Sequence, residues 1–179
     1  MKHPSYTVRN AKSEEFETVG RLMVKVYSQL EGFPKANEQP AYYRTLANVG
    51  DFTAKPDTEL IVAVSRDGKI HGALVYFGDM QYYGSGGSAT GERNAAGFRL
   101  LAVDSARRGT GIGKLLVQAC IDRAKASKCD QVIIHSTKSM LIAWKMYENF
   151  GFERSVDLDF LQGELAVFGF RLVLKTDKI

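Results

Sequence analysis

Residues 100–116 join an apolar segment, a glycine-rich loop and the start of a helix without a break. Glycine lets the backbone approach a ligand closely, because it carries no side chain. The first N–H groups of a helix have no partner within the helix, and they lie at the positive end of its dipole. A strand that enters a helix through such a loop predicts an anion site, and a phosphate or pyrophosphate is the ligand that fits it. Arg108 and Lys114 add positive charge there.

Three phosphate-binding loop patterns can be compared with this segment. A Walker loop fails at two positions, where the chain has Arg108 and Leu115 instead of a glycine and a serine or threonine. A dinucleotide-binding fingerprint fails at its third glycine, which is Lys114 here. The pattern R-x-x-G-x-G is met in full over residues 108–113. The third pattern is therefore the one that we carry forward.

The rest of the chain alternates between strand and helix patterns. Apolar residues recur every three or four positions in the expected helices, at residues 16–30, 39–49, 112–128 and 140–150. Short apolar runs predict strands at residues 6–9, 60–65, 70–77, 95–103, 131–135, 153–160 and 166–174. Asp67 and Gly68 predict a hairpin turn, and Gly151 predicts a C-terminal helix cap. Residues 79–94 are rich in glycine and have no apolar period, so we expect a mobile loop there.

Length and composition are those of a globular protein. The chain has 179 residues, of which 45% are hydrophobic and 25% are charged, so it can bury a substantial core. No internal repeat or linker divides it, and we expect a single domain over residues 1–179. No signal peptide is evident, and no apolar run approaches the ~20 residues that a membrane span needs. We therefore expect a cytoplasmic protein.

The charged residues and the cysteines exclude several other classes of protein. The net charge is only +4, and the lysines and arginines are scattered, so the sequence does not indicate nucleic-acid binding. Cys120 and Cys129 fall in or beside one expected helix, roughly 13 Å apart along its axis, which is too far for a disulfide. No cysteine and histidine cluster has metal-ligand spacing. We expect reduced thiols and no metal site.

A second motif follows the glycine loop after one further strand. It reads M-x-x-A-x-x-x-Y-E-x-x-G-F over residues 140–152. Together with L-x-V before the loop and R-G-T-G-I-G within it, this motif resembles the GNAT superfamily of N-acetyltransferases. The resemblance is specific over residues 95–152, and the expected order of elements is also that of the family. It implies an α/β fold with a mixed, centrally splayed β-sheet of six to seven strands and with helices on both faces.

The resemblance also implies which residues bind acetyl-CoA, the acyl donor of that family. The pantetheine arm would pair with the backbone of the strand before the loop, at Leu101, Ala102 and Val103. Met140 stands where many relatives have an asparagine that contacts the donor. The pyrophosphate would lie on N–H groups of the loop, at Arg108, Gly109, Thr110, Gly111, Ile112, Gly113 and Lys114.

The resemblance further implies the catalytic chemistry. A family tyrosine protonates the departing thiolate, and Tyr147 holds its place. Such a proton donor is needed because an amine attacks a thioester, an oxyanion forms and a thiolate leaves. No Cys–His or Ser–His arrangement is evident in the sequence, so we expect direct attack without a covalent enzyme intermediate. Some relatives have a glutamate base on the fourth strand, where this chain has Ala96, Gly97 and Phe98. A water relay or the free-amine fraction of the acceptor would then serve instead.

Several of these residues also have a purely structural explanation. The loop glycines alone could form only a turn, and Tyr147 could be only a core tyrosine. We expect His135, which lies in a buried type of strand, to be a core histidine with its hydrogen bonds satisfied. Glu92, Asp157 and Asp159 are expected to be solvated loop charges, although any of them could hold a cationic amine.

The sequence therefore predicts an N-acetyltransferase that moves an acetyl group from acetyl-CoA to a primary amine. The acceptor would be a small-molecule or peptide amine. A homodimer is possible on this sequence. Neither nucleic acid nor a membrane is expected as a partner. The alternative is a non-catalytic acyl-CoA-binding sensor on the same fold. The missing carboxylate on the fourth strand and the presence of Met140 keep that alternative open, and Tyr147 argues against it.

Overall fold

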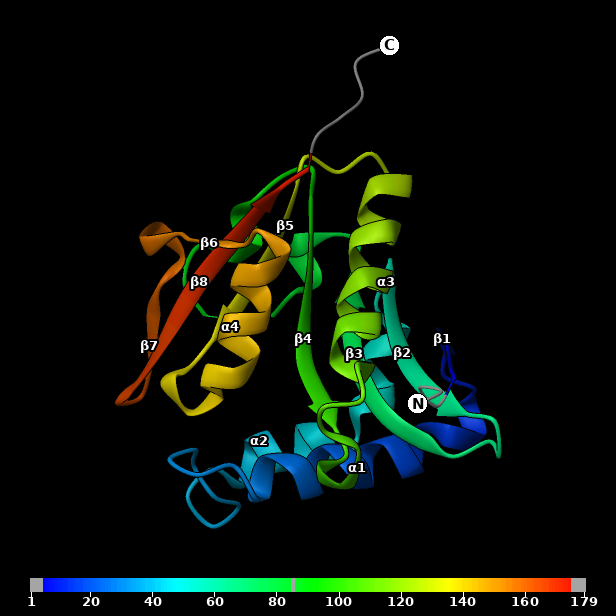
Figure 1. The fold of residues 1–179 in the computed structure, drawn as a ribbon. Helices are drawn as coiled ribbons and strands as arrows, with labels where there is room; N and C mark the ends of the chain where they lie inside the picture. The colour runs from blue at the N-terminus through cyan, green and yellow to red at the C-terminus, as the bar shows by residue number, and fades with distance from the viewer. Residues whose placement is uncertain (1–4, 85, 175–179) are drawn as a thin grey trace. The chain divides into compact units, whose positions relative to one another are not determined.

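The computed structural model describes residues 5–84 and 86–174, and its eight strands form one open, mixed sheet (Figure 1). The strand order is β1-β2-β3-β4-β5-β8-β6, and β7 pairs with β8. Strand β4 pairs parallel with β5, whereas β8 pairs antiparallel with β5, β6 and β7. The strands are β1 (Tyr6–Asn10), β2 (Thr58–Ser65), β3 (Ile70–Phe77), β4 (Ala95–Val103), β5 (Gln131–Ser136), β6 (Glu153–Arg154), β7 (Phe160–Gln162) and β8 (Leu165–Val173). The mixed α/β fold expected from the sequence is confirmed.

The helices also lie where the apolar periods predict them. They are α1 (Phe16–Ser28), α2 (Pro40–Ala47), α3 (Ile112–Ala126) and α4 (Leu141–Phe150). The predicted cap of α4 is confirmed, because Gly151 has a φ of 102° and its N–H bonds the carbonyl of Glu148. The predicted hairpin turn is confirmed as well, since Gly68 has a φ of 82° and its N–H bonds the carbonyl of Ser65.

The prediction of one continuous strand over residues 153–160 is wrong, because its middle part is not a strand. The structure has two short strands there, β6 and β7, separated by the 3-10 turn η7 (Val156–Leu158). The side chain of Leu158 is completely buried in this turn, and it lies against Gly169 of β8. Because Gly169 has no side chain, the turn can pack on β8. The apolar pattern of residues 153–160 does not indicate this contact.

The glycine-rich segment 79–94 contains more structure than its composition suggests. It holds two 3-10 turns, η3 (Met80–Tyr82) and η4 (Ala89–Gly91). Met80, Tyr83 and Ala89 are buried, and the hydroxyl of Ser88 donates to the carbonyl of Asp157 at 3.0 Å. The mobility of this segment stays a prediction, which amide hydrogen exchange compared with β4 would measure.

The chain divides into two compact units. Among the described residues, the first contains 5–75 and 100–119, and the second contains 76–84, 86–99 and 120–174. The expectation of a single domain therefore stays a prediction. Cys120 and Cys129 are both buried, and no disulfide joins them.

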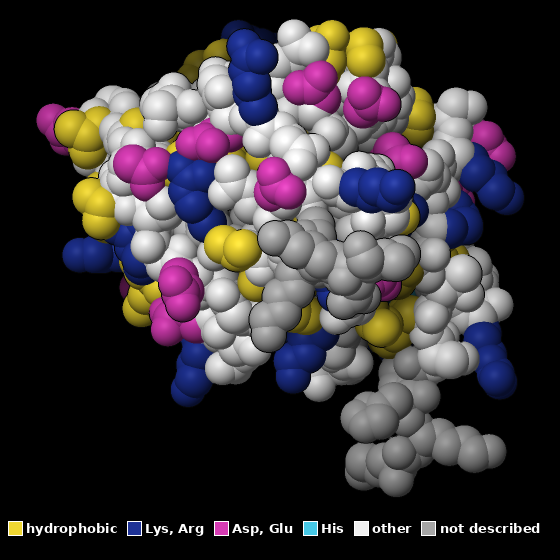
Figure 2. Space-filling model, turned by 90° about the horizontal axis from the view of Figure 1, so that it is seen from above, with side chains coloured by type: hydrophobic (Ala, Val, Ile, Leu, Met, Phe, Trp, Pro, Cys, Tyr) yellow, Lys and Arg dark blue, Asp and Glu magenta, His cyan; other side chains and the backbone are white. Residues whose placement is uncertain are grey.

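Two further observations concern the chain as a whole. Within residues 5–84 and 86–174, no helix is long and apolar enough to cross a membrane. On the face shown in Figure 2, the visible acidic and basic side chains are interspersed.

Candidate active site

Strand β4 changes its conformation at Leu100, shortly before the glycine loop. Leu100 has a φ of 59°, a left-handed value that bulky side chains rarely adopt inside a strand. The pairing of β4 with β5 covers only residues 95–97 of β4, whereas β5 continues to Ser136 in its pairing with β8. The pairing between β4 and β5 thus ends before Leu100, as the central splay of the sheet requires.

The backbone that follows Leu100 is the predicted place for the pantetheine arm. The carbonyl of Leu101 already accepts a hydrogen bond from the hydroxyl of Tyr27 in α1, at 3.2 Å. A carbonyl oxygen has two lone pairs, so this bond does not exclude a second donor. Ala102 is buried, and Leu101 and Val103 are half-buried. The role of these three residues stays a prediction.

The glycine loop, residues 108–114, has the open backbone that an anion site needs. Gly109 and Gly111 have φ values of 79° and 87°, and a Cβ atom added to either would meet no other atom within 4 Å. The hydroxyl of Thr110 donates to the carbonyl of Arg107 at 2.6 Å, which closes the turn from within. The side chains of Arg108 and Lys114 are exposed. The loop therefore leaves space and positive charge beside its own backbone.

Helix α3 starts within this segment, at Ile112, and packs on β3. Its first residue, Ile112, is almost completely buried. A Cβ atom added to Gly72 of β3 would lie 2.5 Å from the Cγ2 atom of Ile112 and 3.3 Å from the carbonyl oxygen of Ala102. Glycine at position 72 thus lets the helix start approach the sheet. The N-terminal end of α3, with its unsatisfied N–H groups, is fixed in this way.

Asp104 holds the turn that leads into the loop. Its carboxylate accepts from the N–H of Ala106 at 3.2 Å, and its carbonyl accepts from the N–H of Arg107 at 2.8 Å. These bonds cap the short 3-10 turn η5 (Ser105–Arg107). The N–H of Asp104 bonds the carbonyl of His71 in β3, also at 2.8 Å. The entry to the loop is therefore tied to the neighbouring strand.

Tyr147 belongs to the second unit and faces inward from α4. Only 5% of its surface is exposed, and its ring packs against Phe98 and Phe152 at centroid distances of 5.8 and 5.9 Å. Burial raises the pKa of its phenol well above the ordinary value, so the group keeps its proton at neutral pH. Within residues 5–84 and 86–174, its hydroxyl has no hydrogen-bond partner. A protonated hydroxyl without a partner is suited to act as a proton donor.

Met140 lies at the N-terminal end of α4. It is half-buried and occupies the N-cap position, where its side chain makes no capping hydrogen bond. Its N–H donates to the carbonyl of Thr137 at 3.0 Å. An asparagine side chain at this place could cap the helix or donate a hydrogen bond to a ligand, and the methionine side chain can do neither. Whether Met140 contacts the donor stays a prediction.

His135 is a core histidine with both ring nitrogens satisfied, as expected. Its Nδ1 atom lies 2.9 Å from the hydroxyl of Tyr83, and its Nε2 atom lies 2.9 Å from the carbonyl of Leu158. Because a carbonyl only accepts, Nε2 carries the hydrogen and Nδ1 accepts from Tyr83. Burial lowers the pKa of His135, which keeps the ring neutral.

Gly97 explains why β4 carries no carboxylate base at this position. A Cβ atom there would lie 2.7 Å from the carbonyl oxygen of Ile133 and 2.8 Å from the sulfur of Met80. Any side chain at position 97 would therefore overlap with the neighbouring strand and with the 79–94 segment. A carboxylate base at position 97 is therefore excluded by packing.

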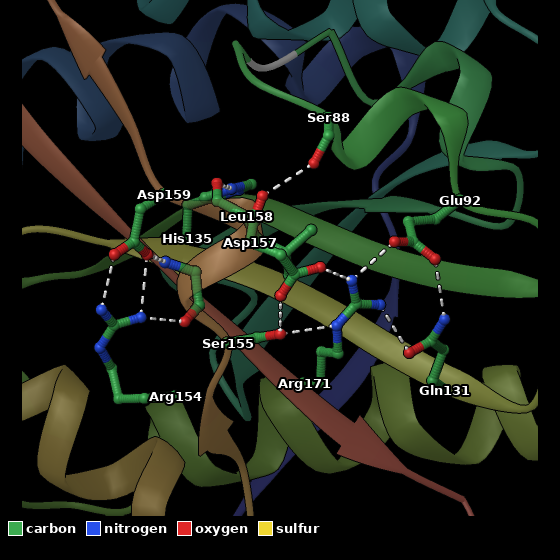
Figure 3. A network of polar contacts seen from close by, with 11 residues as sticks. Ser88, Glu92, Gln131, His135, Arg154, Ser155, Asp157, Leu158, Asp159 and Arg171 are labelled. Carbon is green, nitrogen blue, oxygen red and sulfur yellow. Dashed lines mark hydrogen bonds and ion pairs between the residues drawn. The ribbon is translucent and has the colours of Figure 1, made fainter.

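The three carboxylates expected to be solvated are instead held by arginines (Figure 3). Arg171 of β8 binds Glu92 at 2.6 Å and Asp157 at 2.5 Å, and Arg154 binds Asp159 at 2.7 Å. The hydrogen bond from Arg171 lowers the pKa of Glu92. The expectation is wrong for Glu92 and Asp159, whose side chains are only 27% exposed, whereas Asp157 stays a largely solvated charge that Arg171 also binds. Arg171 lies 79 positions from Glu92, so no local pattern marks this pair.

A Ser–His contact is present that the sequence did not reveal. The hydroxyl oxygen of Ser65 lies 3.1 Å from the Nε2 atom of His71, across the β2–β3 turn. The same hydroxyl contacts the carboxylate of Asp67. Because a carboxylate only accepts, the Ser65 proton points to Asp67, and Nε2 must donate to Ser65. This orientation is the reverse of that in an activated nucleophile.

Comparison with known proteins bears on this geometry. The profile of the acetyltransferase (GNAT) family matches residues 23–152. The chain belongs to this family. The match begins well before residue 95, where the sequence motifs became specific. Acetyl-CoA is the acyl donor that GNAT enzymes use, and the open, positively charged loop before α3 fits its pyrophosphate.

Solved structures agree with the fold. An acetyltransferase of the GNAT family from Staphylococcus aureus Mu50 superposes with a TM-score of 0.73 at 16% identity, over 96% of this chain and 100% of that chain. The yncA protein of Salmonella typhimurium, solved with its cofactor acetyl-CoA, gives a TM-score of 0.64 at 15% identity, over 98% of this chain and 97% of that chain.

One curated relative adds similarity in sequence. It is N-alpha-acetyltransferase 30 of Saccharomyces cerevisiae, which is 38% identical over 55 residues. The matched segment covers 31% of this chain and 31% of that relative. This similarity is local, and it leaves most of both chains unmatched.

Four residues at the site were missed by the sequence patterns. They are Tyr27, which bonds β4, Gly72, which admits α3, His71, which faces Asp104, and Leu100, with its left-handed conformation. The isolated glycine inside an apolar strand was the one available signal, because such a glycine often marks a close approach. The other three depend on contacts between distant segments.

Proposed function

We propose that the chain is an acetyl-CoA-dependent N-acetyltransferase that transfers the acetyl group directly to a primary amine. The observation that carries this proposal is the glycine loop. Gly109 and Gly111 take left-handed conformations with empty space beside them, directly before the N-terminal end of α3, whose first residue, Ile112, is buried. Membership of the GNAT family supplies the donor that this loop would bind.

The loop residues would hold the donor by its pyrophosphate. N–H groups at the helix start, together with the exposed cations Arg108 and Lys114, favour an anion at this point. The backbone of residues 101–103 would take the pantetheine arm. The end of the β4–β5 pairing at Gly97 supports this assignment, because residues 101–103 lie beyond the paired part of β4 on that side.

Tyr147 would act as the general acid. The attacking amine forms a bond to the thioester carbon, the carbon–sulfur bond breaks, and the proton of the Tyr147 hydroxyl passes to the departing sulfur. The raised pKa of the phenol keeps that proton in place until the thiolate develops. Direct attack needs no enzyme nucleophile, and Ser65 is not arranged as one.

A water molecule or the free fraction of the acceptor would take the proton from the amine. Packing leaves no room for a carboxylate at position 97 of β4, and both nitrogens of His135 already have partners. An acceptor amine that is partly neutral at working pH would therefore react best. The yeast relative is an N-alpha-acetyltransferase, which makes peptide N-termini reasonable first acceptors to test beside small amines.

The test is turnover of acetyl-CoA against a panel of amines, read as free thiol. The panel would pair each free-amine peptide with the same peptide blocked at its N-terminus, and would include small primary amines. Thiol release that depends on a free primary amine, with acetylated product of matching mass, is expected. Tight acetyl-CoA binding without release for any amine would reject catalysis and would support the acyl-CoA-binding sensor instead.

A further inference from the structure

The carboxyl-terminal part of β4, residues 101–103, is held by a side chain that the proposed chemistry does not use. This part of the strand lies beside α1 (Figure 1), and the hydroxyl of Tyr27 in α1 donates to the carbonyl of Leu101 at 3.2 Å. Only 4% of the surface of Tyr27 is exposed. Its ring packs edge-on against Phe33 and Tyr42, at centroid distances of 5.4 and 6.3 Å. The hydroxyl therefore has little freedom to turn away from Leu101.

Two residues at the end of β4 direct their backbone groups towards β3. The N–H of Asp104 donates to the carbonyl of His71 at 2.8 Å. The carbonyl oxygen of Ala102 lies 3.3 Å from the position of a Cβ atom added to Gly72, so it points to the same strand. The backbone polar groups of successive residues in a strand point to opposite sides. The N–H and C=O of Ala102 therefore face β3 and not the other edge of β4.

The other edge of this segment is formed by the backbone groups of Leu101 and Val103. The pairing of β4 with β5 covers only residues 95–97 of β4, so these groups lie beyond it. Tyr27 binds the Leu101 carbonyl on this edge, as the alternation requires. Val103 then directs one donor and one acceptor to the same side, and an amide of the pantetheine arm needs both.

The segment that carries Val103 is held at both ends. The Leu101 carbonyl is bound to α1 through Tyr27, and the N–H of Asp104 is bound to β3. The peptide groups between these two bonds are thus fixed in an extended form in the protein without a ligand. A binding edge that is already ordered does not have to be ordered by its ligand, and this raises affinity.

We propose that Tyr27 is a positioning residue for donor binding, whose hydroxyl fixes the Leu101 carbonyl so that Val103 presents its backbone N–H and C=O to the pantetheine arm of acetyl-CoA. This inference rests on the proposed function and narrows it, because it assigns the amide pairing to Val103 and none to Ala102. Tyr27 acts through Leu101 and not on the reacting atoms. Its loss should therefore weaken donor binding and leave kcat at saturating donor nearly unchanged.

The first experiment tests the hydrogen bond itself, by NMR in the free protein. Labelling leucine carbonyls with ¹³C and alanine amides with ¹⁵N gives one correlation for each Leu–Ala pair. The sequence has three such pairs, Leu46–Ala47, Leu101–Ala102 and Leu165–Ala166. Because a carbonyl shift depends on the hydrogen bonds that the oxygen accepts, Tyr27→Phe should move the Leu101–Ala102 signal most, and the other two signals report that the variant is folded. An unmoved Leu101–Ala102 signal would overturn the proposal.

The second experiment measures acetyl-CoA affinity by calorimetry, with KM and kcat from steady-state kinetics, for Tyr27→Phe and a matched control. Tyr43→Phe is that control, because Tyr43 is also a buried tyrosine and its hydroxyl donates to the backbone carbonyl of Pro34 at 2.8 Å. Each variant loses one such bond, so the two melting temperatures should fall by similar amounts. Only Tyr27→Phe should weaken acetyl-CoA binding, by about twofold to tenfold, the usual contribution of one hydrogen bond. Its KM for acetyl-CoA should rise in step, with wild-type kcat.

The possible outcomes separate this inference from the proposed function. Wild-type affinity in Tyr27→Phe would overturn the positioning role and leave the proposed function standing. Equal losses of affinity in Tyr27→Phe and Tyr43→Phe would do the same, because they would reflect general destabilisation. Absence of acetyl-CoA binding by the wild type would reject the proposed function, and this inference with it.

Discussion

Glycines have opposite roles in the glycine loop and in strands β4 and β8. The second region also holds the network of Arg154 and Arg171 with the carboxylates of Glu92, Asp157 and Asp159. In the loop, Gly109 and Gly111 have left-handed conformations and nothing close to the position of a Cβ atom. In the sheet, Gly97 and Gly169 have no positive φ, and a Cβ atom would overlap with backbone or side-chain atoms of a neighbouring segment. The first pair leaves space for a ligand, whereas the second pair is needed for packing. Substitutions in the two regions should therefore separate binding from stability.

The cationic side chains of the two regions show the same contrast between availability for a ligand and contribution to the fold. Arg108 and Lys114 of the loop are exposed, and in the described part of the chain neither makes an ion pair. Arg154 and Arg171 of the network each hold carboxylates, and Arg154 also lies over the ring of Phe168 at 5.1 Å. Cations that remain available can bind an anionic ligand. Cations that are already paired contribute to the fold.

Tyr147→Phe should have the largest effect, because it removes the proposed acid from an otherwise packed position. We expect kcat to fall by ~10²–10⁴-fold, the usual contribution of general acid catalysis. The ring and its contacts with Phe98 and Phe152 remain, so acetyl-CoA affinity should stay nearly unchanged. Steady-state kinetics and calorimetry on the same preparations would measure both quantities.

The competing explanation of Tyr147 as a core residue predicts a different result. The hydroxyl makes no hydrogen bond in the described part of the chain, so its loss would then leave the free energy of unfolding nearly unchanged, with wild-type kcat. The value of kcat distinguishes the two cases, and melting temperature measured beside it checks that the variant is folded. Wild-type turnover by Tyr147→Phe would remove this residue from the mechanism.

Gly97→Ala should destabilise the protein through packing alone. The new methyl group would lie 2.7 Å from the carbonyl oxygen of Ile133, which is backbone and cannot move aside cheaply. We expect the free energy of unfolding to fall by about 1–3 kcal/mol, the typical effect of overpacking. Urea unfolding followed by circular dichroism measures this change.

Gly91→Ala is the matched control in the same unit. Gly91 has no positive φ, and an added Cβ atom would meet nothing within 4 Å. Its stability should change by less than ~0.5 kcal/mol or rise slightly. Equal losses in the two variants would show that the close contact of Gly97 is not what the sheet depends on.

The same contrast explains what the sequence could predict. The loop was recognisable because its signals are local: arginine, spaced glycines and a helix start follow one another within residues 108–114. Strand and helix positions followed from apolar periods for the same reason. Glu92 was misjudged because its partner Arg171 is placed beside it by strand register and lies 79 positions away along the chain. Asp159 was misjudged although Arg154 is only five positions away, because the turn between them decides whether the two side chains meet.

The residues that position the site depend on similar long-range contacts. Tyr27 meets Leu101 across 74 positions of the sequence. The Ser65–His71 contact is short in sequence, but it depends on how the β2–β3 turn folds. No alternation or motif marks either contact. Prediction from one sequence therefore finds the groups that would touch the donor more readily than the groups that hold them in place.

Gly111→Asp should have the opposite effect to Gly97→Ala. It should lower acetyl-CoA affinity more than it lowers the free energy of unfolding. The carboxylate would lie where the pyrophosphate is proposed to bind, so we expect acetyl-CoA affinity to fall on the order of tenfold or more. Gly111→Asn has nearly the same shape and backbone strain without the charge, so the difference between the two variants isolates electrostatics. Calorimetry at low and high salt would measure it. Equal affinities for the Asp and Asn variants would contradict an anion site here.

The smallest effect is expected at an ion pair outside both regions, between Arg9 of β1 and Glu15 before α1. The two side chains are joined at 2.8 Å, and the hydrogen bond from Arg9 lowers the pKa of Glu15 to about 2. A depressed carboxylate pKa gives stability that is present above the unfolded value of ~4.3 and is lost as the pH falls toward the folded value. The pair is partly exposed, so we expect less than ~1 kcal/mol. Glu15→Gln should remove that amount at pH 7 and much less at pH 3.

The control for this pair is Glu14→Gln, which removes the neighbouring, exposed charge. Urea unfolding at pH 7 and pH 3 should give the same difference between the two pH values for Glu14→Gln and for the wild type. The difference should shrink only in Glu15→Gln, because only that variant lacks the carboxylate that Arg9 holds. Parallel profiles in all three proteins would mean that the acid sensitivity of the fold arises elsewhere. The arginine-bound carboxylates Glu92 and Asp157 would then be the next groups to test, since the pKa of each is also lowered.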